Sequence, residues 1–238
     1  MKKREIDYKK YHRDRDYLEN EKLFRNIFKK RFNEAVKHVK KEGSVLEIGA
    51  SNGVMLDIFK AAGWKTWGVE PSENAKAAAG KGHRILKDYF EQVELPENYF
   101  DIVIANHTLE HMDDPLFVLR KVKRILKPGG IVYIDVPNAG GAAARLLGKN
   151  WPYLLPLEHR HQFTRQSLEK IFKEAGFRVI HFESRSGLFE FADPAAELVI
   201  SLTGLKKRFF VNLLTFPYAL IVSLFNAGDS MSMVGRKD

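Results

Sequence analysis

The 238-residue sequence predicts an α/β fold in which helices cover both faces of a mostly parallel sheet. Short, continuous apolar runs alternate along the chain with stretches of helical spacing. Strands without polar alternation are typical of a parallel sheet whose two faces are both covered. A hydrophobic content of 45% and a charged content of 29% fit a globular protein, and the length fits one large domain.

Residues 1–43 are predicted to form a basic helical arm. Apolar residues recur at helical spacing from Leu23 to Val39, with Lys and Arg between them, and Gly43 ends the segment. Most of the formal net charge of +9 lies in this arm, which is either a solvated helix or a surface for anionic lipid or nucleic acid. The charged start is unlike a secretory signal, and the absence of Cys excludes disulfides and thiol chemistry. These features predict a cytoplasmic location.

Residues 44–184 are predicted to hold the core of the sheet. Apolar runs predict six strands there, at residues 45–48, 66–70, 84–86, 100–105, 131–136 and 177–183. Helical spacing predicts helices at residues 54–62, 115–126 and 167–175, with a turn at residues 127–130. Residues 229–238 are expected to form a last strand.

The most specific motif is a glycine-rich loop between the first strand and the next helix, Glu47-Ile48-Gly49-Ala50-Ser51-Asn52-Gly53. Gly49 permits a tight turn, and Gly53 lets the helix begin close to the strand. About twenty residues later, Glu70 ends the second strand, where a carboxylate can accept both ribose hydroxyls of a nucleoside. The alternative is a structural turn beside a solvated Glu.

This loop reads E-x-G-x-x-x-G rather than the dinucleotide pattern G-x-G-x-x-G, and it resembles motif I of the class I S-adenosylmethionine-dependent methyltransferases. The similarity to this family extends over residues 44–184 and the final strand. The sequence also resembles a bacterial branch of the family whose members modify small molecules, glycans or lipids. Further matching segments are Asp88, residues 101–107, residues 109–115 and residues 126–130. Ser51 departs from the pattern, because many relatives carry Gly there.

The resemblance implies a Rossmann-like sheet of seven strands, the last of them antiparallel, and S-adenosylmethionine as cofactor. It implies no metal. The cofactor-binding residues expected from it are Glu47, Gly49, Ala50, Ser51, Gly53, Glu70, Pro71, Asp88, Tyr89, Asn106 and His107.

Residues 138–166 follow the fifth strand and are expected to form a lid over the site, because ligands bind at the carboxyl ends of parallel strands. By resemblance, His159 in this segment is the first candidate for a general base, and His107 and His111 are further candidates. The alternative is that His159 only packs or caps the lid. Tyr153 is expected to orient an acceptor hydroxyl.

Residues 185–228 are expected to be a helical apolar insertion, whose residues 209–225 carry no charge and follow Lys206, Lys207 and Arg208. Pro217 and the length of this run argue against a membrane-spanning helix. One possibility is a pair of helices packed on the core, the lid or a second copy. The other is a peripheral membrane contact through residues 206–225, or an apolar entrance for the substrate, either of which suits a hydrophobic acceptor.

These observations predict a methyltransferase that acts on oxygen of a small-molecule, glycan or lipid-linked acceptor. The basic arm supports an RNA methyltransferase as an alternative, but the chain lacks the Asn-Pro-Pro-Tyr signature of base-amino methyltransferases and any RNA-binding module. A cofactor-binding scaffold without catalysis is the second alternative. The oligomeric state is not predicted.

Overall fold

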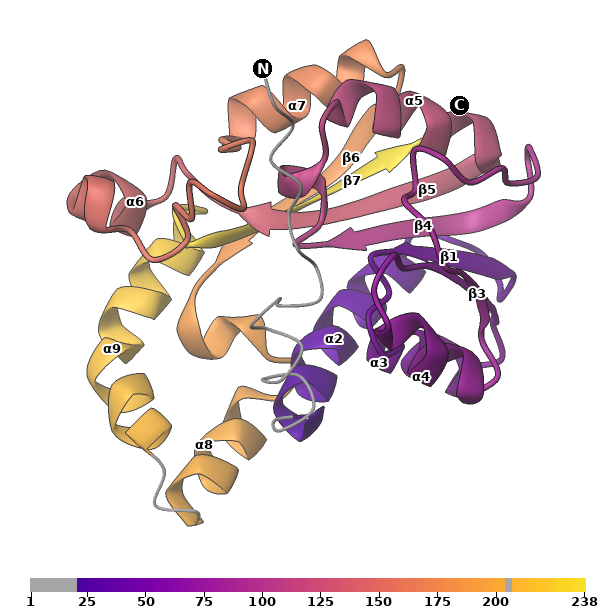
Figure 1. The fold of residues 1–238 in the computed structure, drawn as a ribbon. Helices are drawn as coiled ribbons and strands as arrows, with labels where there is room; N and C mark the ends of the chain where they lie inside the picture. Colours follow the sequence, from indigo (N-terminus) through magenta and orange to yellow (C-terminus); the bar gives the residue numbers. More distant parts are fainter. Residues whose placement is uncertain (1–20, 204–206) are drawn as a thin grey trace.

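A computed structural model describes residues 21–203 and 207–238, so residues 1–20 of the predicted arm lie outside the described residues. Its centre is a seven-stranded sheet in the order β3-β2-β1-β4-β5-β7-β6 (Figure 1). The strands are β1 (Ser44–Ile48), β2 (Lys65–Val69), β3 (Arg84–Leu86), β4 (Phe100–Asn106), β5 (Leu126–Pro137), β6 (Arg178–Arg185) and β7 (Ser230–Arg236). Only β7 runs antiparallel to its neighbours, β5 and β6, which confirms the predicted Rossmann-like fold class.

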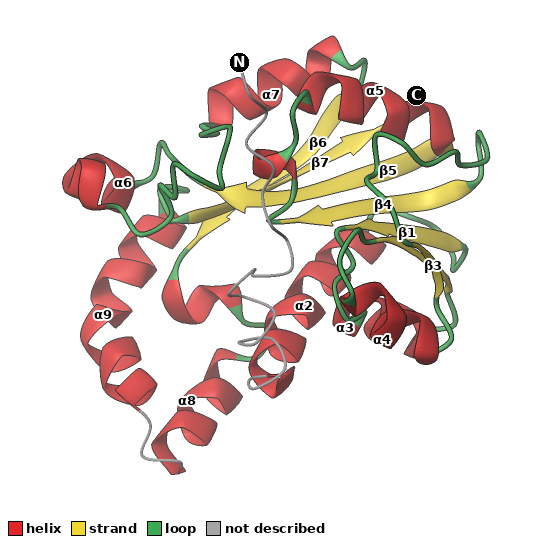
Figure 2. Ribbon diagram, viewed as in Figure 1, coloured by secondary structure: helices red, strands yellow, loops and turns green. Residues whose placement is uncertain are grey.

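Helices cover both faces of the sheet (Figure 2). One face carries α2 (Glu21–Val36), α3 (Val54–Ala61) and α4 (Asn74–Gly80), and the other carries α5 (Pro115–Ile125) and α7 (Arg165–Glu174). Along β4, Ile102 and Ile104 pack toward α2 and α3, whereas Val103 and Ala105 pack toward α5 and α7. Both faces are therefore apolar, which explains the uninterrupted apolar runs in the sequence.

Local sequence signals mark the beginning of two of these helices. Asp114 caps α5 by accepting a hydrogen bond from the amide of Phe117, and Thr164 and Ser167 form a capping box on α7. The predicted turn at residues 127–130 was wrong, because these residues belong to β5, where the pairing with β4 is irregular and Gly129 has φ of +77°. The short helix α4 was not predicted.

A buried ion cluster fastens α2 to the sheet. Arg31 on α2 donates to the Oδ1 of Asp135 on β5 at 2.9 Å, and Arg185 on β6 donates to the Oδ2 of the same side chain. All three side chains are at most 3% exposed. Burial alone would raise the pKa of Asp135, but the two guanidinium groups outweigh it and hold that pKa below its ordinary value.

The remaining helices lie beyond the sheet. The segment after β5 forms α6 (Ala142–Leu147) and η3 (Gly148–Asn150), and the segment between β6 and β7 forms η4 (Gly187–Glu190), α8 (Pro194–Thr203) and α9 (Lys207–Leu224). Helix α9 continues through Pro217. Among the described residues, no helix has both the length and the apolar character needed to cross a bilayer.

Candidate active site

The glycine-rich loop turns sharply at the carboxyl end of β1. Gly49 has φ of +76°, and a Cβ built on it would lie 2.6 Å from the Oγ1 of Thr108, which follows β4. Thr108 itself donates a hydrogen bond to the carbonyl of Ile48 at 3.2 Å. Only glycine fits this position, because it tolerates the positive φ and leaves room for the neighbouring strand end.

Glu70 lies directly after β2 and faces the loop. Its Oε2 accepts a hydrogen bond from the amide of Ser51 at 2.8 Å, and its Oε1 accepts one from the amide of Ser72 at 2.9 Å. Each carboxylate oxygen keeps a second lone pair for another donor. Ser51 has φ of +43°, so it occupies the left-handed conformation that glycine adopts most easily.

Two buried acceptor atoms between β1 and β4 have no hydrogen-bond partner among the described residues. They are the Oε2 of Glu47 and the Oδ1 of Asn106, two residues whose side chains meet at 3.5 Å. Burial raises the pKa of Glu47 well above its ordinary value, the interaction with Asn106 lowers it, and the nearby charge of Glu70 adds to the rise. A cationic ligand group such as an ammonium would satisfy both atoms.

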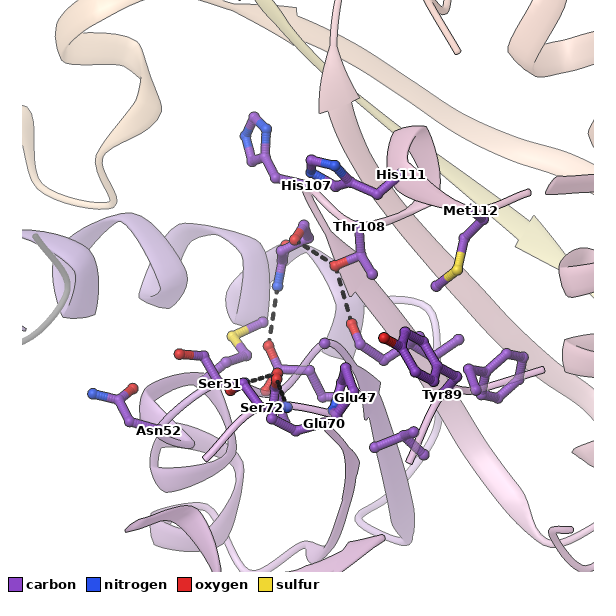
Figure 3. Close-up of a pocket in the computed structure, with 18 of the residues that line it drawn as sticks. Glu47, Ser51, Asn52, Glu70, Ser72, Tyr89, His107, Thr108, His111 and Met112 are labelled. Atoms are coloured by element: carbon purple, nitrogen blue, oxygen red, sulfur yellow. Dashed lines mark hydrogen bonds between the residues drawn. The ribbon is translucent and has the colours of Figure 1, made fainter. Parts of the chain in front are cut away.

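These residues line one pocket at the carboxyl ends of β1, β2 and β4 (Figure 3). Of the expected cofactor-binding residues, the pocket brings together Glu47, Gly49, Ala50, Ser51, Glu70, Pro71, Tyr89, Asn106 and His107. Gly53 and Asp88 are not part of the lining. Gly53 begins α3 with φ of +81°, and Asp88 is exposed and accepts a hydrogen bond from the amide of Tyr89.

The three candidate histidines gather around one buried carboxylate, that of Glu110. His107 places its Nδ1 3.5 Å from the Oε1 of Glu110, and His159 places its Nε2 3.9 Å from the same oxygen. The rings of His111 and His159 meet edge to face at 4.8 Å. Burial alone would raise the pKa of Glu110, but His107 and His111 outweigh it and hold that pKa below its ordinary value.

The histidines differ in their access to the pocket. His107 and His111 line it, on the side away from the glycine-rich loop (Figure 3), whereas His159 is only 4% exposed and does not line it. The Nδ1 of His111 lies 2.9 Å from the carbonyl of Glu158, and the Nδ1 of His159 lies 2.8 Å from the carbonyl of Tyr153. A carbonyl only accepts, so both rings carry a proton on Nδ1, which makes Nε2 the basic nitrogen of a neutral ring. The ring of Tyr153 stacks on His107 at 6.5 Å.

In the part of the chain that the structure describes, two groups of side chains have the spacing that a metal ion needs. One is Glu110, His111 and His159 beside the pocket, and the other is Glu34, His38 and His181 between α2 and β6. In each group the ligand atoms lie within 4.8 Å of one another. The expectation that the protein uses no metal therefore stays a prediction.

Sequence reasoning missed four residues that shape the site, namely Phe28, Thr108, Glu110 and Asp135. Phe28 brings α2 to the pocket, and the Oδ1 of Asp135 lies 3.4 Å from the Nε2 of His107. Asp135 did carry a signal, because it is an acid within a strand that is otherwise apolar. Phe28 and Thr108 carried none, since their roles depend on which elements meet in space.

Comparison with known protein families gives one match that covers most of the chain. A family described as "Methyltransferase domain" matches residues 17–182. A C-methyltransferase of Streptomyces niveus, NovU, is 28% identical over 162 residues, which are 64% of this chain and 38% of the relative. A ubiquinone biosynthesis O-methyltransferase of Bradyrhizobium is 34% identical over 102 residues, which are 40% of each protein. The match therefore spans about two fifths of the length of these relatives.

Solved structures share the fold at low sequence identity. A methyltransferase of Archaeoglobus fulgidus superposes with a TM-score of 0.65 and 20% identity, over 93% of this chain and 99% of that one. Phosphoethanolamine N-methyltransferase 2 of Haemonchus contortus, solved with S-adenosylmethionine, gives a TM-score of 0.61 and 19% identity, over 94% of this chain and 60% of that one.

Proposed function

The chain belongs to the S-adenosylmethionine-dependent methyltransferases, and from this premise we propose that it methylates a hydroxyl of a small-molecule, glycan or lipid-linked acceptor. The observation that carries the proposal is the position of Glu70. Its carboxylate is fixed by the amides of Ser51 and Ser72 beside the tight turn at Gly49. This arrangement suits the two ribose hydroxyls of the cofactor.

The pocket also suits the cationic end of the cofactor. The partnerless Oε2 of Glu47 and Oδ1 of Asn106 are placed to accept hydrogen bonds from its ammonium group. Tyr89 is 44% exposed at the pocket and offers a ring for the adenine. When bound, S-adenosylmethionine supplies a methyl group that its sulfonium already activates.

The protein then has to align the acceptor and receive its proton. His111 is our first choice for the proton acceptor, since it lines the pocket and the carbonyl of Glu158 fixes its tautomer. His107 lies between the carboxylates of Glu110 and Asp135 and suits a role in holding the acceptor hydroxyl. His159 remains a candidate for positioning His111, because the rings of the two residues pack against each other.

The test is calorimetric titration with S-adenosylmethionine, S-adenosylhomocysteine and NAD, followed by transfer of a labelled methyl group to extracts. We expect binding of the first two compounds only, and label in a small-molecule, lipid or glycan fraction. Binding of NAD alone would overturn the cofactor assignment. Binding of S-adenosylmethionine without transfer to any fraction would favour a non-catalytic scaffold, and label in RNA would favour the RNA methyltransferase.

The cytoplasmic location also stays a proposal.

A further inference from the structure

A large apolar surface extends over α6, α8 and α9. Among the described residues, nearly all exposed large hydrophobic side chains lie between Leu146 and Phe225, the exceptions being Tyr89 and Phe117. We call this set the apolar surface, and its members are Leu146, Leu147, Leu157, Val199, Ile200, Leu202, Phe210, Val211, Leu213, Leu214, Phe216, Tyr218, Ile221, Leu224 and Phe225. A contiguous patch of this kind marks an interaction site.

Packing among the described residues covers only one side of α9. Asn212, Ala219 and Val222 are buried, and α9 contacts η4, β6 and α8, whereas Leu214 is 81% exposed and Leu224 is 70% exposed. The run from residue 209 to residue 225 contains no charged residue, in a chain of which 29% is charged. A helix that is apolar on its outward side as well as its inward side needs a second apolar environment.

The parts of this surface belong together in space. The amide of Ala142, which begins α6, donates to the carbonyl of Ala227 just after α9, at 2.8 Å. Tyr218 of α9 contacts the backbone of Ala143 in α6. Figure 1 shows α6 and the carboxyl end of α9 on the side of the sheet toward which β4 and β5 point. The pocket opens at the carboxyl ends of β1, β2 and β4, so it lies on this side as well.

Within residues 138–157 and 198–228, the segments that carry the apolar surface, the charged residues are all basic, whereas Glu158 and Asp229 directly follow these segments and Asp229 interacts with Tyr218. Neither residues 138–157 nor residues 198–228 contain an Asp or Glu, and their charged residues are Arg145, Lys149, Lys206, Lys207 and Arg208. Arg145, Lys149 and Lys207 are exposed. Cations beside an apolar helix are the combination that binds anionic lipid headgroups while apolar side chains enter the acyl region.

We propose that the apolar surface docks on an anionic lipid bilayer, with α9 lying in the interface. A symmetric dimer through the same surface would place the cations of one copy near those of the other, without an acidic partner in these segments. Docking would hold the pocket beside the membrane, where a lipid-linked acceptor is presented. The docking itself does not depend on the proposed function, because it needs neither cofactor nor acceptor.

The experiment is sedimentation of the full chain with vesicles of phosphatidylcholine alone, and with vesicles in which about a third of the lipid is phosphatidylglycerol. We expect binding to the second kind, weakened by salt. The double variant Leu214→Glu/Leu224→Glu should bind at least about tenfold more weakly, because each change removes an exposed apolar side chain from the acyl region. Arg145→Glu/Lys149→Glu should weaken binding to the anionic vesicles alone.

Phe117→Glu is the matched control, since Phe117 is 47% exposed on α5 and lies outside the apolar surface. It should leave vesicle binding unchanged, and all variants should keep their affinity for S-adenosylhomocysteine, which shows that they are folded. Absence of binding to both kinds of vesicle would overturn the proposal. Equal, salt-independent binding to both would overturn the assignment to anionic lipid. A dimer in solution that Leu214→Glu/Leu224→Glu dissociates, without vesicle binding, would assign the surface to a second copy instead.

Discussion

The carboxylate of Glu70 accepts a hydrogen bond from the backbone amide of Ser51 at 2.8 Å, which joins the end of β2 to the glycine-rich loop. Glu70 is only 7% exposed, although it lines the pocket. It holds the loop in place, and in the proposed function it also presents oxygen atoms to the ribose of the cofactor.

The first prediction concerns Glu70. We expect Glu70→Ala to weaken binding of S-adenosylmethionine at least about tenfold, because hydrogen bonds to a charged acceptor are lost. Calorimetric titration measures this change. Glu73→Ala is the matched control, because Glu73 lies in the same segment but its side chain is 58% exposed and does not line the pocket. Equal affinities of wild type and Glu70→Ala would show that Glu70 does not contact the cofactor.

The second prediction concerns Gly49. Gly49→Ala should abolish detectable cofactor binding and lower the melting temperature, because the added Cβ meets the Oγ1 of Thr108 at 2.6 Å and φ is +76°. Gly80→Ala is a suitable control, since nothing lies within 4 Å of a Cβ at Gly80, which is in α4. It should be neutral or stabilising by up to about 1 kcal/mol. Normal binding by Gly49→Ala would contradict the tight turn described here.

The third prediction is a pH dependence that Glu47 controls. Burial raises the pKa of Glu47 well above its ordinary value, so this carboxyl keeps its proton to a higher pH than an ordinary Glu does. A cationic cofactor favours the ionised form, so binding should release a proton, and affinity should increase as the pH rises toward the raised pKa. Calorimetry in buffers of different ionisation enthalpy counts the released proton. In Glu47→Gln the proton release should disappear, and an unchanged release would assign it to another group.

The stability of the cofactor-free protein should also depend on the ionisation of Glu47. Unlike the affinity for the cofactor, this stability should fall as the pH rises. The folded-state pKa of Glu47 lies above its unfolded value of about 4.5, so ionisation costs more in the folded protein. Its contribution to stability is present below that unfolded value and is lost as the pH rises toward the folded-state pKa. Glu47→Gln should remove this loss.

The fourth prediction separates the roles of His111 and His159. His111→Ala should lower kcat by about 100-fold or more, while the affinity for S-adenosylhomocysteine stays the same. His159→Ala should also reduce turnover, but His159→Asn keeps a donor for the carbonyl of Tyr153, with which His159 interacts at 2.8 Å. If His159 is a positioning residue, His159→Asn recovers activity and the pH profile of the wild type. If His159→Asn is as inactive as His159→Ala, His159 itself is the better candidate for the base.

Much of the sheet could be predicted from the sequence because its strands are buried on both faces. The strand expected within residues 229–238 is β7 (Ser230–Arg236), and the apolar runs before it correspond to the other six strands. Residues 127–130 were read as a turn, because a Pro-Gly-Gly sequence is a turn signal when the neighbouring strand is unknown. These residues have no partner on β4, and it is the backbone hydrogen bonds of Gly129 and Gly130 with Lys237 near the chain end that continue β5 through them.

The candidate site could be predicted only in part. Gly49 and Glu70 belong to a motif of fixed spacing, so the sequence alone indicated them. The convergence of His107, His111 and His159 on Glu110 depends on how the segment after β5 folds back, which local patterns do not encode. The side-chain direction of Glu110 was equally hidden, because an acid in a loop is normally solvated.

The last prediction concerns Asp135, the acid between Arg31 and Arg185. Asp135→Asn should destabilise the protein by about 3–5 kcal/mol, because two buried guanidinium groups lose the more deeply buried of the two carboxylates that they share, the other being that of Glu190. A surface pair provides the control, since Arg124 and Glu97 are both more than half exposed and Arg124→Ala should change stability by less than about 1 kcal/mol.

Because the folded-state pKa of Asp135 lies below its ordinary value of 3.8, the contribution of Asp135 to stability should be present above that pH and be lost as the pH falls further. Denaturant titrations between neutral pH and pH of about 2 should therefore show a loss in the wild type that is smaller in Asp135→Asn. Equal stability of the two proteins at neutral pH would mean that the cluster does not fasten α2 to the sheet.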